Sequence, residues 1–198
     1  MTILYIHGYG STGNATKGQM LRRMMPDHKV ISPTFDYDNS TPWQIQEQIR
    51  MAVESEKVKM IVGSSFGGYH TICSTVFFHG IVWAINPVHD VEATIRRVIL
   101  NQEAANGNVP NKAAQSFLEI YRDFNEKVFL HRAAINQQGL WPHDTPLNFA
   151  LSSDDELLGD HNPLLNLFPT HNSVIWKDHC GHRFFRFEEL KSELHSCL

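Results

Sequence analysis

The hexapeptide Gly63-Ser64-Ser65-Phe66-Gly67-Gly68 stands between an apolar run, Met60–Gly63, and an apolar stretch with helical character, Gly67–Phe78. It fits the pattern G-x-S-x-G, with Ser65 at the centre. In this pattern the serine occupies a sharp, strained turn from a strand into a helix, which raises its hydroxyl above the sheet. The residues two before and two after the serine come close to the turn and must be small, as both glycines are. The stretch therefore predicts a nucleophilic serine at Ser65.

The same turn has other interpretations, and a second serine competes with the first. For Ser64, the residue two positions earlier is Val62, whose branched side chain would clash at the turn. A phosphate-binding loop would carry a lysine beside Ser or Thr after its glycines, and this stretch has none. The dinucleotide-binding pattern G-x-G-x-x-G is not matched either. Nucleophilic catalysis at Ser65 is thus the interpretation that the residues favour.

The surrounding chain alternates short apolar, β-branched runs with helix-like stretches. Such alternation is typical of an α/β domain, with a mostly parallel sheet and helices on both of its faces. We expect strands at Ile3–Ile6, Lys29–Ser32, Met60–Gly63, Ile81–Ile85, Leu147–Leu151 and Ser173–Trp176, and helices at Asn14–Met25, Pro42–Glu54, Gly67–Phe78 and Phe187–Leu194. The length of 198 residues suits a single domain with a sheet of about six strands.

The segment Val88–Pro146 departs from this alternation, because it contains no clear strand. Apolar residues recur there at helical spacing in two groups, which predicts helices on either side of the loop Asn106–Pro110. We expect these helices to form a cap, or lid, inserted into the domain. Aromatic residues at helical spacing more often pack a cap onto the core than line a pocket. The possible pocket walls are Phe117, Tyr121, Phe124, Phe129 and Trp141, and the first candidates among them are Phe117, Tyr121 and Trp141.

Composition and charge exclude several classes of protein. The net charge is −4 and the 17 Lys and Arg residues are scattered, so we expect no nucleic-acid partner. The 3 cysteines are too few for a disulfide framework, which favours a reducing compartment. Met1–Ile6 lacks the basic start of a signal peptide, and no apolar run approaches the ~20 residues of a membrane span. We therefore expect a soluble cytoplasmic protein with no membrane partner.

A loop that can stabilise an oxyanion follows the first expected strand. Acyl transfer needs two backbone N–H groups aimed at the carbonyl oxygen on which negative charge develops. One comes from the residue after the nucleophile, here Phe66, and the other from a loop after an earlier strand, commonly just past a His-Gly pair. In His7-Gly8-Tyr9-Gly10 that second residue is Tyr9. We expect His7 to hold the loop rather than to move protons.

The acid of a Ser-His-acid triad is expected in a loop after a late strand, because the chain order in this architecture is serine, acid, histidine. After Leu147–Leu151 the chain reads Ser-Ser-Asp-Asp-Glu-Leu-Leu. Asp155 begins the Asp-Glu-Leu-Leu run and is the first candidate, followed by Asp154 and then by Asp160. The alternative is that these acids cap a short helix. We take Asp155 as the acid and leave Asp154 as its rival.

The base is expected after the last strand, where the chain reads Asp178-His179-Cys180-Gly181-His182-Arg183-Phe184. A Gly-His-x-Phe pattern ahead of a final helix favours His182 as the base, with His179 as the rival. The two histidines flank Cys180, which could indicate zinc, but no second pair of ligands has the proper spacing. We therefore expect no metal at this loop.

With these motifs in place, the chain resembles the small bacterial esterases of the YqiA type, which are α/β-hydrolases. The similarity covers most of the chain in outline. It is closest at Ile6–Tyr9, Gly63–Gly68, Ile85–Pro87, Asp155–Leu158 and Gly181–Phe184. The family's nucleophile, acid and base fall on Ser65, Asp155 and His182. Gly10–Lys17 and Asn101–Leu140 depart from the family pattern, and the second of these would lie over the site and shape the pocket.

The resemblance implies an α/β-hydrolase fold and hydrolysis of small-molecule carboxylic esters with short acyl chains, or of thioesters, without a cofactor. The residues themselves predict a serine hydrolase that works through an acyl-enzyme. Two alternatives stay open. One is a thioesterase or peptidase on the same triad, and the other is a catalytically silent hydrolase-fold protein that binds a ligand. Because helical caps can join subunits, either a monomer or a homodimer is expected.

Overall fold

The computed structural model describes residues 1–105 and 112–198, with side chains described outside residues 98–100 and 102–115. The loop expected at Asn106–Pro110 lies outside the described residues. The described chain forms one sheet of six parallel strands in the order β2-β1-β3-β4-β5-β6. The strands are β1 (Thr2–Ile6), β2 (Lys29–Ile31), β3 (Val58–Ser64), β4 (Ile81–Ile85), β5 (Leu147–Ser152) and β6 (Ser173–Lys177).

The strand order contains a change of direction. After β1 the chain adds β2 on one side, and it then returns to add β3 on the other side of β1. From β3 onward, each new strand is added further out, ending at β6. In open parallel sheets, ligands bind outside the carboxyl ends of the strands at such a switch point. The loops after β1 and β3, which carry Tyr9 and Ser65, leave the sheet at this position.

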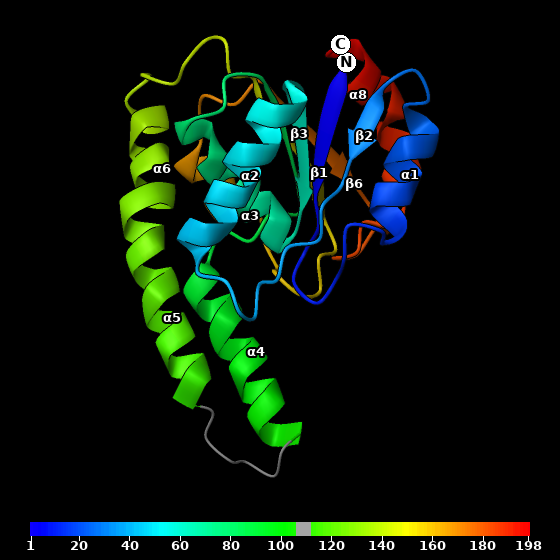
Figure 1. Ribbon diagram of the computed structural model, residues 1–198. Helices are drawn as coiled ribbons and strands as arrows, with labels where there is room; N and C mark the ends of the chain where they lie inside the picture. Colours follow the sequence, from blue (N-terminus) through cyan, green and yellow to red (C-terminus); the bar gives the residue numbers. More distant parts are fainter. Residues whose placement is uncertain (106–111) are drawn as a thin grey trace.

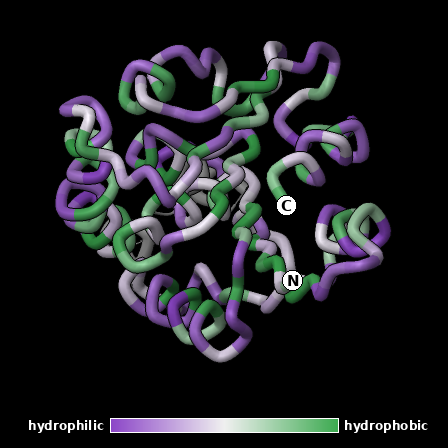
Figure 2. Tube along the Cα trace, turned by 90° about the horizontal axis from the view of Figure 1, so that it is seen from above, coloured by the Kyte–Doolittle hydropathy of each residue, from purple (hydrophilic) through white to green (hydrophobic). Residues whose placement is uncertain are grey.

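Two apolar cores cover the two faces of the sheet, because alternate residues of a strand point to opposite sides. In β1, Leu4 belongs to one core and Tyr5 to the other. Figure 2 shows hydrophobic segments gathered toward the middle of the molecule. The helices flank the sheet as Figure 1 shows, with α2 (Pro42–Glu56) and α3 (Phe66–Cys73) on one face and α1 (Thr16–Met24) and α8 (Lys191–Ser196) on the other. The predicted α/β fold is confirmed.

Local sequence explains how the helices begin and end. In α2, Pro42 occupies the first turn, and Thr41 and Gln44 form a capping box in which each side chain accepts the other's backbone N–H. The helix stops at Lys57, which takes a left-handed φ of 51°. Two helices are extended by tight turns, η1 (Ser74–Val76) after α3 and η3 (Phe187–Leu190) before α8.

Helices fill the described part of the insertion between Val88 and Pro146. They are α4 (Val91–Ala105), α5 (Lys112–Phe124), the π-helical turn η2 (Asn125–Phe129) and α6 (Leu130–Gln137). α4 and α5 lie side by side and project beyond the carboxyl edge of the sheet (Figure 1). Arg122 of α5 joins them through an ion pair of 2.8 Å with Glu92 of α4. At the inner end of α5, Phe124 packs edge-on against Trp43 of α2, with ring centroids 4.7 Å apart.

A short helix that the sequence analysis named only as an alternative, α7 (Asn162–Leu167), follows the loop after β5. Its 6 residues make fewer than two turns, so no helical period could show in the sequence. Among the described helices, none combines the length and the apolar character that crossing a bilayer requires.

Candidate active site

Ser65 occupies the turn between β3 and α3, with φ 56° and ψ −122°. This backbone conformation is rare for a residue with a side chain and costs on the order of 1–3 kcal/mol. The turn is also crowded: a Cβ atom at Gly63 would lie 2.4 Å from the carbonyl oxygen of Gly67. A Cβ atom at Gly67 would lie 2.2 Å from the carbonyl oxygen of Ile6 in β1. Both flanking positions therefore have room for glycine only.

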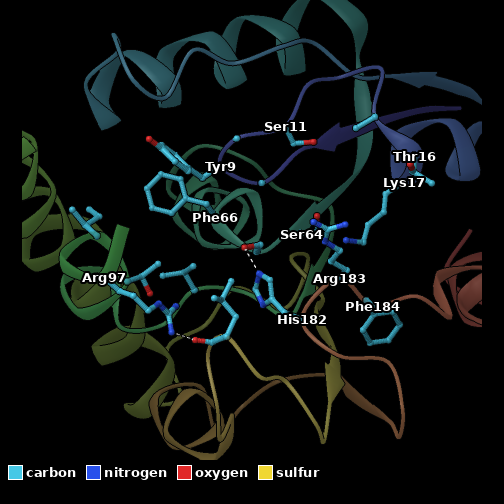
Figure 3. Close-up of a pocket in the computed structure, with 18 of the residues that line it drawn as sticks. Tyr9, Ser11, Thr16, Lys17, Ser64, Phe66, Arg97, His182, Arg183 and Phe184 are labelled. Carbon is cyan, nitrogen blue, oxygen red and sulfur yellow. Dashed lines mark hydrogen bonds between the residues drawn. The ribbon is translucent and has the colours of Figure 1, made fainter. Parts of the chain in front are cut away.

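The two adjacent serines face different surroundings. The hydroxyl of Ser64 makes a hydrogen bond of 2.9 Å with the buried phenol of Tyr5. The hydroxyl of Ser65 instead reaches the imidazole of His182, with 2.8 Å between Oγ and Nε2. Ser65 and His182 are 117 positions apart in the chain, and the fold brings them into contact. Both residues line one pocket, and a dashed line at His182 in Figure 3 marks this hydrogen bond.

The other ring nitrogen of His182 faces the carboxylate of Asp155. Nδ1 lies 3.1 Å from Oδ1 and 3.0 Å from Oδ2. Because an ionised carboxylate only accepts hydrogen bonds, Nδ1 carries the ring proton and Nε2 is left to accept from the Ser65 hydroxyl. This is the tautomer that a general base needs. The structure thus brings together the three residues expected from the sequence as nucleophile, acid and base.

Asp155 is buried and accepts hydrogen bonds from four groups. The backbone N–H groups of Leu157 and Leu158 donate to Oδ1 at 2.9 and 2.8 Å. His161 donates from Nε2 to Oδ2 at 3.1 Å, and His182 completes the set. Burial alone would raise the pKa of Asp155, but the hydrogen bonds from His161 and His182 outweigh it and hold the pKa well below its ordinary value. The carboxylate is therefore charged at neutral pH.

The acids on either side of Asp155 hold the backbone of the loop after β6, called the histidine loop here because it carries His182. Asp154 accepts the N–H groups of Cys180 and Gly181, both at 3.1 Å. Glu156 accepts the N–H of His182 itself at 2.7 Å. Three consecutive acids thus act on one loop, and only the middle one contacts the imidazole.

The amide of Asn86, just after β4, joins the ends of the late strands. Its Nδ2 donates to the carbonyl oxygens of Gly181 and His182 at 3.0 and 3.1 Å. Its Oδ1 accepts the N–H of Ser152 at the end of β5 at 2.7 Å. The residue takes a left-handed φ of 39°. Sequence reasoning gave Asn86 no role, although the Asn-Pro pair stops β4 and Ile85–Pro87 is one of the stretches closest to the family.

The remaining rival residues of the sequence analysis lie outside the set of hydrogen bonds that links Ser65, His182 and Asp155. Asp160 is exposed and accepts the N–H of Asn162 at 2.9 Å, at the start of α7. His179 is exposed and does not line the pocket. Among the described residues, no group of three or more His, Cys, Asp or Glu is arranged to hold a metal ion.

The loop after β1 runs directly beside the nucleophile. A Cβ atom at Gly8 would lie 3.2 Å from the Cβ of Ser65, so the two backbones approach closely. Tyr9 lines the pocket, and its ring meets that of Phe66 edge-on at 6.2 Å. Phe66 is the first residue of α3, so its N–H has no carbonyl oxygen one turn earlier to accept it. Both residues expected to supply oxyanion donors therefore lie next to Ser65.

His7 anchors this loop from behind. Its Nε2 accepts the backbone N–H of Phe35 at 2.9 Å, so the ring proton is on Nδ1, which donates to the carbonyl oxygen of Gly8 at 2.8 Å. The phenol of Tyr37 donates to the carbonyl oxygen of His7 at 2.7 Å. Burial lowers the pKa of His7, and the ring stays neutral. A neutral imidazole used at both nitrogens holds the backbone and has no proton to exchange with a substrate.

A cavity of about 800 Å³ opens at Ser65 and His182. Of the three aromatic residues expected to line it, Phe117 does so. Tyr121 does not, because it is fully buried, with its hydroxyl 3.1 Å from Nε2 of His70. Trp141 does not either, because it packs 4.5 Å from the guanidinium of Arg132 and donates to a carbonyl oxygen in its own loop. Tyr121 and Trp141 thus pack the insertion onto the core, which was the alternative considered for such aromatics.

Several lining residues carry charge that the sequence analysis did not assign to the site. Arg97 of α4 reaches into the cavity and donates to the carbonyl oxygen of Leu157 in the acid loop. Lys17 and Arg183 line the opposite side (Figure 3). Nothing in the local sequence around these cations marks them, because their meeting depends on the packing of α1, α4 and the last loop.

The sequence matches one family model over residues 2–196, that of the uncharacterised protein family UPF0227. The chain belongs to this YqiA-type family. No curated protein matches the chain.

Solved structures similar to this family member are α/β-hydrolases. Mouse alpha/beta hydrolase domain-containing protein 10 is 14% identical, with a TM-score of 0.68 over 98% of this chain and 88% of that chain. Est1E from Butyrivibrio proteoclasticus is 10% identical, with a TM-score of 0.70 over 98% and 87% of the two chains. The esterase domain of a Rhodothermus marinus protein is 15% identical, with a TM-score of 0.69 over 98% and 85%. At these identities the likeness establishes the α/β-hydrolase fold.

Proposed function

We propose that this protein is a serine hydrolase that cleaves small carboxylic esters with short acyl chains through an acyl-enzyme. One observation carries the proposal. A continuous set of hydrogen bonds links Ser65 Oγ to His182 Nε2 at 2.8 Å, and His182 Nδ1 to Asp155 Oδ2 at 3.0 Å, at the wall of a cavity. A serine hydroxyl becomes nucleophilic when a base takes its proton, and the base needs a fixed tautomer.

In the first step, Ser65 Oγ bonds to the ester carbonyl carbon as its proton passes to Nε2 of His182. The carbonyl oxygen becomes an oxyanion, held by the backbone N–H groups of Tyr9 and Phe66. The tetrahedral intermediate then expels the alcohol oxygen, which takes the proton from Nε2. The acyl group remains on Ser65.

The second step returns the enzyme to its starting state. A water molecule gives one proton to Nε2 of His182 while its oxygen bonds to the acyl carbon. The new intermediate breaks its bond to Ser65 Oγ, which recovers the proton, and the carboxylic acid leaves. Asp155 stays ionised throughout and stabilises the imidazolium, which its low pKa supports.

The ester class draws support from neighbouring proteins rather than from the triad. Two of the similar structures are named as an esterase domain and as Est1E, and another is a monoacylglycerol lipase of Paleococcus ferrophilus. A thioesterase or a peptidase would use the same groups, because leaving-group preference depends on the pocket.

The 3 cysteines are unpaired in the structure, which supports a reducing compartment such as the cytoplasm.

The test is hydrolysis of 4-nitrophenyl acetate and butyrate by the wild type and by Ser65→Ala. We expect Ser65→Ala to lose at least about 10³-fold in kcat/KM. Ser192→Ala, on α8 away from the cavity, serves as the matched control and should hydrolyse both esters at the wild-type rate. Equal rates for the wild type and Ser65→Ala would end the proposal.

Labelling separates the two serines of the turn and tests the catalytically silent alternative. A fluorophosphonate probe should label the wild type and Ser64→Ala, but not Ser65→Ala. Absence of labelling in the folded wild type would instead favour a ligand-binding role. Acyl-thioesters and short peptides offered alongside the esters then rank the leaving groups.

A further inference from the structure

Two cations meet at one side of the candidate active site. Lys17 lies in the first turn of α1, and Arg183 follows His182 directly. Figure 3 shows their side chains pointing toward one another beside Ser64, within the cavity that Ser65 faces. Neither side chain makes a hydrogen bond or ion pair with any residue of the described chain. Two like charges are thus held together with no counter-ion among the described side chains.

The other charged residues of the cavity do not neutralise this pair. Arg97 adds a third positive charge, and it donates to the carbonyl oxygen of Leu157. The one acid among the described lining residues is Asp38, which accepts a hydrogen bond from the hydroxyl of Tyr9. Figure 3 draws Tyr9 and Arg97 on the far side of the Ser65–His182 contact from Lys17. The described lining of the cavity is therefore net positive, in a chain whose net charge is −4.

Burial and mutual repulsion both act on Lys17. Burial lowers its pKa, and the charge of Arg183 lowers the pKa further, to about 8. The ammonium group is thus mostly protonated at neutral pH, but at an energetic disadvantage. An anion placed between the two cations would remove that disadvantage and form charge-assisted hydrogen bonds with both. The arrangement is more favourable with an anion bound than without one.

The start of α1 adds to the positive potential. Its N-cap, Ala15, has no side-chain acceptor, and the first turn contains no acidic residue. Ala15 and Thr16 line the same cavity as Lys17. The free N–H groups and the positive end of the helix dipole therefore act on the cavity together with the two side chains.

We infer that Lys17 and Arg183 form a subsite for an oxyanion group, a carboxylate or a phosphate, on the ester that Ser65 attacks. The inference rests on the proposed function for the reaction, and it names the substrate class: small esters that carry a negative charge close to the scissile carbonyl. The planar guanidinium provides a paired donor for the oxyanion, and the ammonium provides a point charge.

Matched pairs of esters test the subsite. One pair places the charge on the acyl part, as mono-4-nitrophenyl glutarate against its methyl ester. The other pair places it on the alcohol part, as 2-(butyryloxy)ethyl phosphate against its dimethyl ester. We expect the wild type to prefer the charged member of at least one pair. Lys17→Met and Arg183→Gln should each reduce that preference about tenfold, the usual effect of one charge-assisted hydrogen bond. The pair that responds shows whether the subsite takes a carboxylate on the acyl part or a phosphate on the alcohol part.

Lys191→Met, an exposed lysine at the start of α8, is the control and should keep the wild-type preference. Lys17→Met keeps the aliphatic stem in its half-buried position, and Arg183→Gln changes an exposed side chain, so the second variant decides the matter if the first is poorly folded. Equal kcat/KM within both pairs for the wild type would overturn the inference while leaving the proposed function intact.

Binding provides a readout that does not require turnover. Ser65→Ala should bind the charged ester of the preferred pair in calorimetry, and adding Lys17→Met should weaken that binding about tenfold. If no ester is hydrolysed but this binding difference is seen, the proposed function fails and the subsite stands. Binding that is the same with and without Lys17 would refute the subsite.

Discussion

Nε2 of His161 lies 3.1 Å from Oδ2 of Asp155, and both side chains are fully buried. The carboxylate that orients His182 is therefore held by a second imidazole, which does not line the cavity. Sequence reasoning passed over His161, because a lone histidine in a loop resembles any other of the 12 in the chain.

We predict that His161→Ala lowers kcat on the order of tenfold, because Asp155 loses one of its donors and with it part of its orientation. KM should change little, since His161 does not touch the cavity. His161→Gln can still donate a hydrogen bond from its amide and should recover part of kcat. Steady-state kinetics on 4-nitrophenyl butyrate measure this, with circular dichroism to check folding. A change confined to KM, or a Gln variant no better than Ala, would contradict a positioning role.

Asn86 gives a second prediction, because its amide donates to two carbonyl oxygens of the histidine loop. Asn86→Asp keeps the size of the side chain and its tolerance of positive φ, but it points a carboxylate oxygen at those carbonyls. We expect a loss of at least about 2 kcal/mol in unfolding free energy and a lower kcat. Asn86→Gly removes the contacts without adding charge and should be less damaging than Asp. Urea denaturation and kinetics compare the two, and wild-type behaviour of Asn86→Asp would be evidence against the role.

Glycine at position 67 is required by space rather than by backbone angle. Gly67→Ala would bring its Cβ within 2.2 Å of the carbonyl oxygen of Ile6, so β1 and the turn must move apart. The matched comparison is Gly139→Ala. A Cβ atom at position 139 would meet nothing within 4 Å, but the backbone there has a φ of +70°. We expect Gly139→Ala to cost about 1–2 kcal/mol from backbone strain alone. Gly67→Ala should lower the unfolding free energy by more than that and abolish ester hydrolysis. Thermal denaturation ranks them, and a smaller loss for Gly67→Ala would disprove the steric argument.

His70 should make the protein sensitive to acid. Burial lowers its pKa to about 3, from an ordinary value of 6.5. Gln46 donates to its Nδ1, so the ring is neutral, with its proton on Nε2 facing Tyr121. Below pH 6.5 the unfolded chain binds a proton that the folded chain does not, so stability falls as the pH drops toward 3.

The predicted loss from this one histidine is about 2 kcal/mol between pH 7 and pH 5. His70→Gln cannot titrate, so its unfolding free energy should change less over the same range. His131→Gln, at an exposed position on α6, should keep the wild-type change in unfolding free energy with pH. Denaturant titrations at pH 7, 6 and 5 give the unfolding free energy of each of the three proteins as a function of pH. The same pH dependence for the wild type and His70→Gln would show that another group is responsible.

The strands of the sheet could be predicted from the sequence because they are apolar runs bounded by turn residues. Ile81–Ile85 was predicted with the bounds that the structure has, since Gly80 precedes it and Asn86-Pro87 follows it. Ser65, Asp155 and His182 could be proposed from the sequence because each sits in a loop with a recognisable local pattern. The sequence favoured Asp155 over Asp154 only through the Asp-Glu-Leu-Leu run, because both acids precede the same turn and only the fold decides which carboxylate faces the imidazole.

The parts of the site without a local pattern were missed. Lys17 and Arg183 are 166 positions apart by their residue numbers, and no spacing rule connects a helix start with the last loop. Tyr121 and Trp141 were candidates for the pocket because they are aromatic and lie in the insertion. The sequence does not show that the side of the helix bearing Tyr121 faces the core, which also contains a buried histidine.

The amide bridge at Asn86 has a consequence for folding. It links the end of β4 to the end of β5 and to the loop after β6, and β6 is an edge strand whose residues are only partly covered, whereas β5 is buried throughout. Like β2 at the opposite edge, the strand that leads to His182 is less buried than the inner strands of the sheet. Local opening of that edge would withdraw His182 while the rest of the sheet stays intact, so activity should disappear at lower denaturant than ellipticity does.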